Sequence, residues 1–107
     1  MKRLDFDKGN GLLPVIIQEV VTKEVLMMGF MNKEAWKKTK EEKVVWFYSR
    51  TKNRLWMKGE SSGNILAVRN VKTDCDRDAL LIQVEVDGPV CHLGTKSCFT
   101  QTEEESR

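Results

Sequence analysis

Short runs of apolar and β-branched residues, separated by turn residues, recur along most of this chain and limit its fold more than any other feature. Such runs are typical of β-strands. The clearest is Ala79–Val86, in which positions 80, 82 and 84 are apolar while positions 83 and 85 are polar. The chain is therefore expected to be mainly β, bordering on α+β, with a mostly antiparallel sheet.

The remaining expected elements follow from local signals. Pro14 lies near the start of the first run and indicates an edge strand, because proline cannot donate to a strand ladder. Asn32 is a predicted N-cap, and Lys33–Glu42 is the one clear helix, with Glu34 in the first turn where the helix dipole favours an acid. Its expected buried positions are Ala35, Trp36 and Thr39. The other expected strands are Leu12–Val20, Val25–Phe30, Val44–Tyr48 and Ile65–Val71.

Size and charge exclude several classes of protein. The 107 residues predict a single domain over 1–107, with a core of about 11–99 and a flexible tail at 100–107. Eighteen Lys and Arg against sixteen Asp and Glu give a net charge of +2, too balanced to indicate a nucleic-acid binder. No apolar run approaches the roughly 20 residues that span a bilayer, and Met1–Asn10 has no apolar signal core. We expect a cytoplasmic protein that does not bind membranes.

Three cysteines, Cys75, Cys91 and Cys98, lie in the last third of the chain. An odd number without an export signal argues against disulfides and favours reduced thiols that can bind a metal. Their C-x15-C-x6-C spacing lacks the close pairs of a zinc finger. Three thiolates suit zinc and leave one tetrahedral position open, as in catalytic sites; His92 could fill it, although adjacent residues rarely reach one metal together. The alternative is that the cysteines are buried apolar residues.

Asp74, Asp76 and Asp78 alternate around Cys75. In an extended segment the three carboxylates would face one way and Cys75 the other. Three like charges on one face repel unless a cation neutralises them, and Mg²⁺ prefers such oxygen ligands. Two alternatives stay open. One is a solvated acidic turn. The other is a calcium-binding EF-hand loop, in which Glu85 would be the fourth matching position but Ala79 stands in place of the required glycine.

The segment 49–64 combines positive charge, hydroxyl groups, glycines and one indole. Phosphate recognition uses such donors. Trp56 could stack on a base or belong to the core, and the basic residues could equally form a solvated turn. The candidate substrate-binding residues are Ser49, Arg50, Trp56, Lys58, Glu60, Ser61 and Ser62.

Four sets of residues together resemble the phosphoribosyl-AMP cyclohydrolases of histidine biosynthesis. They are GLLP at 11–14 with VLM at 25–27 and FMN at 30–32; YSR at 48–50 with LW at 55–56; KGESSG at 58–63; and DCDRD at 74–78 with CH at 91–92 and SCF at 97–99. The resemblance covers Gly11 to Phe99. Arg77 stands where a glycine is common and Leu93 where a small polar residue is common; these two departures concern the local turn and one polar contact, not the ligands.

The resemblance implies an enzyme that hydrolyses the N1–C6 bond of the adenine ring in 1-(5-phosphoribosyl)-AMP, giving the phosphoribosyl-formimino aminoimidazole carboxamide ribonucleotide. Zn²⁺ would lower the pKa of a bound water toward about 7 so that hydroxide can add at C6. The implied fold is a mostly antiparallel sheet or pseudobarrel within an intertwined homodimer. No pyrophosphohydrolase domain is expected, so the chain would be monofunctional. The implied ligands are Cys75, Cys91 and Cys98 for a zinc shared between subunits, and Asp74, Asp76 and Asp78 for Mg²⁺.

His92 is the only histidine. With an unperturbed pKa near 6.5 it is the expected proton shuttle; the alternative is that it orients the cysteine segment. For the whole chain, the alternative function is a small zinc-stabilised binding module. An open three-thiolate site and a separate carboxylate triad favour the enzyme. Removal of zinc would unfold such a module, whereas an enzyme would lose turnover and keep most of its fold.

Overall fold

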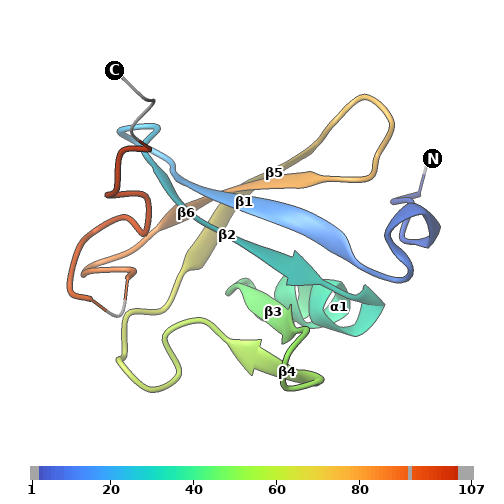
Figure 1. The fold of residues 1–107 in the computed structure, drawn as a ribbon, viewed down its shortest axis with the longest axis horizontal. Helices are drawn as coiled ribbons and strands as arrows, with labels where there is room; N and C mark the ends of the chain where they lie inside the picture. Colours follow the sequence, from blue (N-terminus) through green and yellow to red (C-terminus); the bar gives the residue numbers. More distant parts are fainter. Residues whose placement is uncertain (1–2, 92, 104–107) are drawn as a thin grey trace.

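A computed structural model describes residues 3–91 and 93–103. Figure 1 shows a curved sheet with one α-helix and a separate hairpin at one side. A single α-helix within a mainly β chain confirms the expected fold class for the described part of the sequence. In chain order the elements are η1 (Asp7–Gly9), β1 (Leu13–Glu19), β2 (Val25–Met31), α1 (Lys33–Glu42), β3 (Trp46–Ser49), β4 (Arg54–Met57), β5 (Ala67–Thr73) and β6 (Leu80–Glu85).

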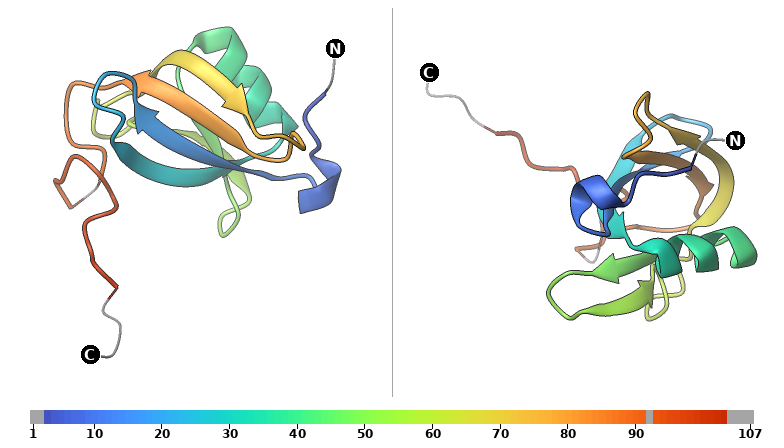
Figure 2. Two further views of the ribbon diagram at one scale, coloured as in Figure 1. Left: turned by 90° about the horizontal axis from the view of Figure 1, so that it is seen from above. Right: turned by 90° about the vertical axis from the view of Figure 1, so that its right-hand side faces the viewer.

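The strands form two sheets. The larger has the order β2-β1-β6-β5, and the smaller is the β3-β4 hairpin. β1 and β6 run parallel, whereas the other three pairs are antiparallel, so the mostly antiparallel arrangement is confirmed. β3 packs against β2 and α1, and Figure 2 shows α1 and the hairpin together on one side of the larger sheet.

The position of β1 corrects one expectation. β1 lies between β2 and β6, in the interior of the sheet and not at its edge. Pro14 is opposite Phe30 of β2, whereas the ladder to β6 begins one residue later, with Val15 opposite Leu80. The proline therefore lies just outside the parallel ladder, where its missing N–H removes no bond to β6.

The helix begins and ends where the sequence predicts. The Asn32 side-chain oxygen accepts from the Ala35 N–H at 2.8 Å, which confirms the N-cap. Ala35 and Thr39 are buried, but Trp36 is only half-buried at the margin of the core. The Thr39 hydroxyl donates to the Ala35 carbonyl at 2.8 Å and accepts from the Trp46 N–H at 3.0 Å. This hydroxyl joins the helix to the start of β3.

The alternation of buried and more exposed side chains along β6 is confirmed with one exception. Leu80, Ile82 and Val84 are buried, as predicted, but Gln83 is also only 4% exposed. Its amide donates to the Gln18 side chain at 2.9 Å and accepts from the Asn70 side chain at 3.2 Å. A buried amide is tolerated because these partners satisfy its hydrogen bonds.

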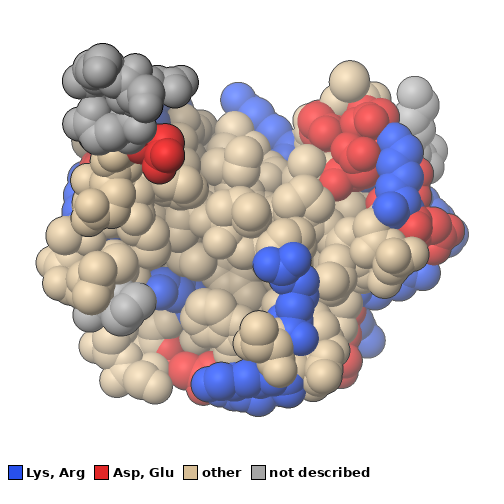
Figure 3. All heavy atoms as spheres, in the orientation of Figure 1, with Lys and Arg blue, Asp and Glu red and all other residues tan. Residues whose placement is uncertain are grey.

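The face of the larger sheet that points away from α1 and the hairpin carries apolar side chains, and nothing in the described chain covers them. Ile16 lies beside Met28 on one side and Leu81 on the other, and Ile16 and Met28 are 41% and 45% exposed. Figure 3 shows few charged side chains at the centre of this side of the molecule, over the region of β1 and β2. Such a patch is typical of an interaction surface.

The C-terminal segment has no regular secondary structure over residues 100–103. The rest of the predicted flexible tail, 104–107, lies outside the described residues.

Candidate functional site

A cavity of about 380 Å³ opens beside the loop that follows β4. Five of the seven predicted substrate-binding residues line it, together with Cys91, a predicted metal ligand. The fold thus brings the candidate substrate loop next to a candidate metal thiol. The predicted residues at the cavity are Trp56, Lys58, Glu60, Ser61 and Ser62; the others are Met57, Gly59, Asn64, Pro89, Val90 and Gly94.

The loop from Lys58 to Gly63 is held by its own groups. Gly59 has φ +90°, and a Cβ there would lie 2.4 Å from the Asn64 carbonyl oxygen, so only glycine fits. The Glu60 carboxylate accepts from the Met57 N–H at 2.9 Å. Glu60 therefore stabilises the loop as well as lining the cavity.

Asn64 is a cavity residue that the sequence did not reveal as one. Its amide donates to the Pro89 carbonyl at 3.0 Å, which fastens the loop to the segment leading to Cys91. The sequence signal, an asparagine directly after Gly63, is typical of a turn. It does not show a partner 25 residues away.

Trp56 fits both interpretations that the sequence left open. Its ring contacts Phe47 of the core, with centroids 5.3 Å apart, and it also lines the cavity. The Lys58 ammonium lies 5.7 Å from the Trp56 ring centroid. One indole therefore supports the core and presents a surface to the cavity.

The Cys91 and Cys98 thiols are close enough for each to shift the pKa of the other, which places two predicted zinc ligands side by side. The Leu93 N–H, helped by the Thr95 side chain, lowers the pKa of Cys91 from its ordinary value. Burial and the neighbouring Cys91 raise the pKa of Cys98, while the Lys58 ammonium favours both thiolates. Cys91 is therefore the first of the pair to reach the thiolate form that binds metals.

Cys75 lies elsewhere. It is exposed in the turn between β5 and β6, whereas Cys91 and Cys98 follow the other end of β6. In Figure 1 the β5–β6 turn is at the upper right and the segment after β6 is at the left. Within residues 3–91 and 93–103 the three thiols do not form one cluster. A site made of all three cysteines therefore needs a second copy of the chain.

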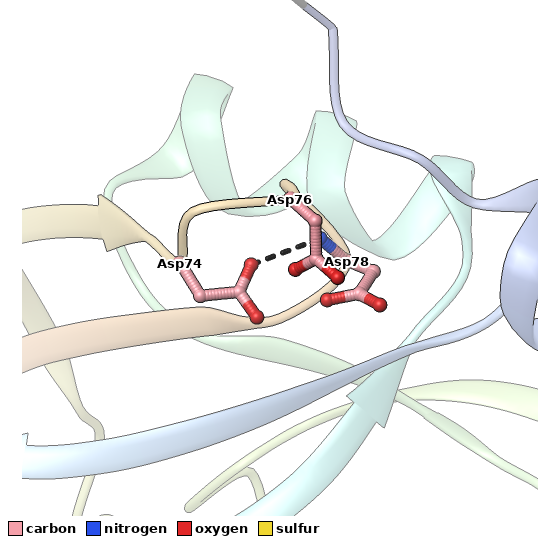
Figure 4. A group of neighbouring side chains, drawn as sticks. All are labelled: Asp74, Asp76 and Asp78. Atoms are coloured by element: carbon pink, nitrogen blue, oxygen red, sulfur yellow. Dashed lines mark hydrogen bonds between the residues drawn. The ribbon is translucent and has the colours of Figure 1, made fainter.

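Asp74, Asp76 and Asp78 do converge, with carboxylate oxygens within 4.8 Å of one another (Figure 4). The reason differs from the one predicted, because residues 74–78 form a turn and not an extended segment. One Asp74 carboxylate oxygen accepts from the N–H groups of Asp78 at 3.0 Å and Ala79 at 3.2 Å. Arg77 has φ +62°, a left-handed conformation that favours glycine. This explains why a glycine suits position 77.

Lys8 completes this cluster, and the sequence did not predict it. Its ammonium lies 2.9 Å from Asp76 and 3.4 Å from Asp78. The ion pair lowers the pKa of Asp76 to about 2, whereas Asp76 and Asp74 together raise the pKa of Asp78. Lys8 and Asp76 are 68 residues apart, so no local pattern could relate them.

Two other predicted substrate residues lie away from the cavity. The Arg50 guanidinium lies 3.9 Å from the Phe30 ring centroid, and the Ser49 hydroxyl accepts from the Lys52 N–H at 3.2 Å. Neither lines the cavity, so one chain alone does not bring them to it. His92 lies outside the described residues.

The fold and these clusters define a small, mainly β protein with adjacent thiols beside a cavity and a separate group of carboxylates. The family model for phosphoribosyl-AMP cyclohydrolase matches residues 27–100. This chain belongs to the phosphoribosyl-AMP cyclohydrolase family, as the sequence resemblance predicted.

Individual relatives agree with this assignment. The chain is 62% identical over 102 residues to a histidine biosynthesis bifunctional protein HisIE of Bacteroides thetaiotaomicron, covering 95% of this chain and 50% of that protein. It is 53% identical over 110 residues to the HisIE protein of Bacillus subtilis, covering 99% and 53%. A phosphoribosyl-AMP cyclohydrolase of Clostridium botulinum is 52% identical over 96 residues, covering 90% and 88%. The chain thus spans about half the length of the bifunctional relatives and most of the third.

Proposed function

We propose that this chain is a phosphoribosyl-AMP cyclohydrolase, which hydrolyses the N1–C6 bond of the adenine ring in 1-(5-phosphoribosyl)-AMP during histidine biosynthesis. The product is the phosphoribosyl-formimino aminoimidazole carboxamide ribonucleotide. The main support is one cavity, within a chain of this family, that joins the loop 58–63 to the thiol of Cys91. We assign this activity to the cytoplasm. Separately, in the part of the chain that the structure describes, no helix is long and apolar enough to cross a membrane.

The loop 58–63 provides the groups that bind the nucleotide. Lys58 supplies a positive charge and the hydroxyls of Ser61 and Ser62 supply donors at the cavity wall, which suits a phosphate group. The indole of Trp56 offers a surface on which a purine can stack. Ser49 and Arg50 belong to the proposed substrate contacts only if they come from a second chain, since they lie away from this cavity.

The thiols suit zinc. Cys91 and Cys98 are adjacent, and the lowered pKa of Cys91 favours the thiolate. We propose that Cys75 of a second copy completes the set, because Cys75 of the same chain lies at the other end of β6. Zinc, when bound, makes a coordinated water acidic enough to act as a nucleophile near neutral pH.

A homodimer accounts for two separate observations. It would cover the exposed apolar patch around Ile16 and Met28, since burying apolar surface drives association. It would also allow the β5–β6 turn of one copy to reach the cysteine segment of the other. We therefore propose that the active unit is a homodimer with shared sites.

The aspartate turn suits magnesium. Three carboxylates within 4.8 Å provide hard oxygen ligands, and in the chain alone one lysine ammonium already pairs with two of them. We propose that Mg²⁺ bound by Asp74, Asp76 and Asp78 anchors phosphate or ribose oxygens of the substrate and does not generate the nucleophile.

His92 is the proposed proton-transfer group. It follows Cys91 directly, and histidine is the most common general acid–base at neutral pH. We propose that it takes a proton from the attacking water or delivers one to the leaving nitrogen.

The test is direct. The purified protein, supplied with Zn²⁺ and Mg²⁺, is incubated with phosphoribosyl-AMP while the ultraviolet spectrum is followed for loss of the purine ring. A chelator-treated sample and unsubstituted AMP serve as controls. Turnover that stops on chelation, with the far-ultraviolet circular dichroism largely kept, supports the enzyme. A zinc-loaded dimer without turnover, which unfolds on chelation, would instead identify a zinc-stabilised binding module.

A further inference from the structure

The cysteine loop, defined as Cys91 and residues 93–98, is fastened to the hairpin of β1 and β2, which has no assigned part in the chemistry. The Cys98 N–H donates to the Leu26 carbonyl at 2.7 Å. The neighbouring Ser97 side chain is buried, at 5% exposed, and its hydroxyl donates to the Val25 carbonyl at 2.7 Å. Cys98 is thus held against the first residues of β2 both by its own backbone N–H and by the side chain of the preceding residue.

Ser97 also orders the residue that follows the thiol. Its hydroxyl oxygen accepts from the Phe99 N–H at 2.9 Å while its proton is directed to β2. One hydroxyl therefore fixes the backbone on both sides of Cys98. An alanine at position 97 would leave the Phe99 N–H and the Val25 carbonyl without this partner.

Lys96 adds a second tie to the same hairpin. Its ammonium pairs with Glu19 at the end of β1 and lies 3.4 Å from Glu24, just before β2. Glu19 is the less exposed of the two acids, with 18% of its side chain accessible. Because the lysine reaches both arms of the hairpin, the pairs hold the cysteine loop in one orientation.

Bonds inside the loop set its shape but not its position. The Val90 N–H donates to the Lys96 carbonyl and the Cys91 N–H to the Thr95 carbonyl, both at 3.1 Å. These bonds close the loop on itself. The placement of its far end, and so of the Cys98 thiol next to Cys91, depends on the ties from Ser97, Lys96 and the Cys98 N–H to the hairpin.

We propose that Ser97 is a positioning residue for the metal thiols: its hydroxyl, seated on the backbone of β2, holds Cys98 beside Cys91 before any metal arrives, and Lys96 supports it. The proposal rests on the proposed zinc function and gives a structural reason why the two thiols can bind the metal together. A preorganised pair of thiols binds metal more tightly because less conformational freedom is lost on binding. Supporting groups of this kind typically change metal affinity by about 10–100-fold when removed.

The experiment measures zinc affinity of the whole protein by competition with a chelating dye, for the unsubstituted chain and for Ser97→Ala. We expect roughly 10–100-fold weaker binding in Ser97→Ala. Thr51→Ala removes a hydroxyl from the β3–β4 turn, away from the cysteine loop, and should leave the affinity unchanged. Cobalt at saturating concentration reports ligand geometry, and its visible spectrum should differ in Ser97→Ala but not in Thr51→Ala.

Lys96→Met tests the second tie without disturbing a buried group. We expect about two- to fivefold weaker zinc binding at low salt, the size typical of exposed ion pairs. The difference should shrink as salt screens the pairs, and Lys96→Arg should restore the affinity. This variant keeps the proposal testable if Ser97→Ala does not fold.

The outcomes separate two failures. Unchanged zinc affinity and an unchanged cobalt spectrum in Ser97→Ala, while the parent chain binds zinc, would overturn the positioning role and leave the zinc function intact. If Ser97→Ala does not fold, full affinity in Lys96→Met at low salt would overturn it. A parent chain that binds no zinc at all would overturn the proposed function, and the positioning role with it.

Discussion

The cysteine loop and the aspartate turn present their side chains by different physical means. Cys91 is buried beside a cavity, and its loop is tied to β2 by the buried hydroxyl of Ser97. Asp74 and Asp76 are exposed, their turn is organised by its own backbone N–H groups, and its negative charge is partly balanced by Lys8. Thiols can be buried while neutral, whereas charged carboxylates need water or a counter-ion. The comparison shows why one thiol, Cys91, can be buried in the fold while the carboxylates lie on the surface, as do the thiols of Cys75 and Cys98.

The strongest challenge to this comparison is removal of one thiol. Cys98→Ser should lose zinc and turnover together, to the limit of detection, because a hydroxyl is a poor substitute for a thiolate at zinc. Zinc content is measured by elemental analysis and turnover by the loss of purine absorbance. Asp76→Asn, which changes the other site, is the control and should keep its zinc. A fully active Cys98→Ser protein without zinc would refute the role of the cysteine loop.

The next largest effect is expected within the same loop. His92→Asn should lower turnover roughly 10²–10⁴-fold, the usual loss when general acid–base catalysis is removed. Zinc content and the dimer, measured by size-exclusion chromatography, should be unchanged. If zinc or the dimer is lost in proportion to activity, His92 orients the loop and is not the proton shuttle. Near-normal turnover with full zinc excludes both roles.

A smaller effect is expected at the aspartate turn. Asp76→Asn removes one charged ligand, and charged hydrogen-bonding groups contribute about 1.5–3 kcal/mol. The magnesium concentration for half-maximal turnover should therefore rise roughly tenfold or more. Glu85→Gln, an acid on the neighbouring strand that pairs with Arg69, serves as the control. Activity that is indifferent both to magnesium and to Asp76→Asn would mean that the carboxylates form only a solvated turn.

The smallest effect concerns the ion pair of Lys8. The pKa of Asp76 is lowered from 3.8 to about 2 chiefly by Lys8, so Lys8→Gln should move it back upward in an NMR titration without metal. Because the folded pKa is the lower one, the stability from this carboxylate is present above about 3.8 and is lost as the pH falls through about 2. Lys72→Gln removes a charge from β5 and is the matched control. If the pKa of Asp76 is unchanged in Lys8→Gln, the turn alone sets that pKa.

Local features of the fold were predictable because they depend on neighbours in the chain. Alternation along β6 and the Asn32 cap both follow from residues a few positions apart, and both are confirmed. The edge strand predicted from Pro14 was wrong. Proline is excluded only where its N–H would be needed in a strand ladder, and the register that leaves Pro14 outside the ladder to β6 is set by the tertiary structure. The aspartates converge as predicted but through a turn, with Arg77 in a left-handed conformation.

By itself the sequence determined the family, the strands, the helix and which thiols and carboxylates are candidates for metals, since these are carried by residue type and short spacing. The tertiary structure decided which of them meet. It joined Lys8 to Asp76 across 68 residues, Ser97 to Val25 across 72, and Asn64 to Pro89 across 25. It also separated Cys75 from the other two cysteines by placing them at opposite ends of β6. Contacts between residues so far apart depend on strand order and register, which local patterns of residues do not contain.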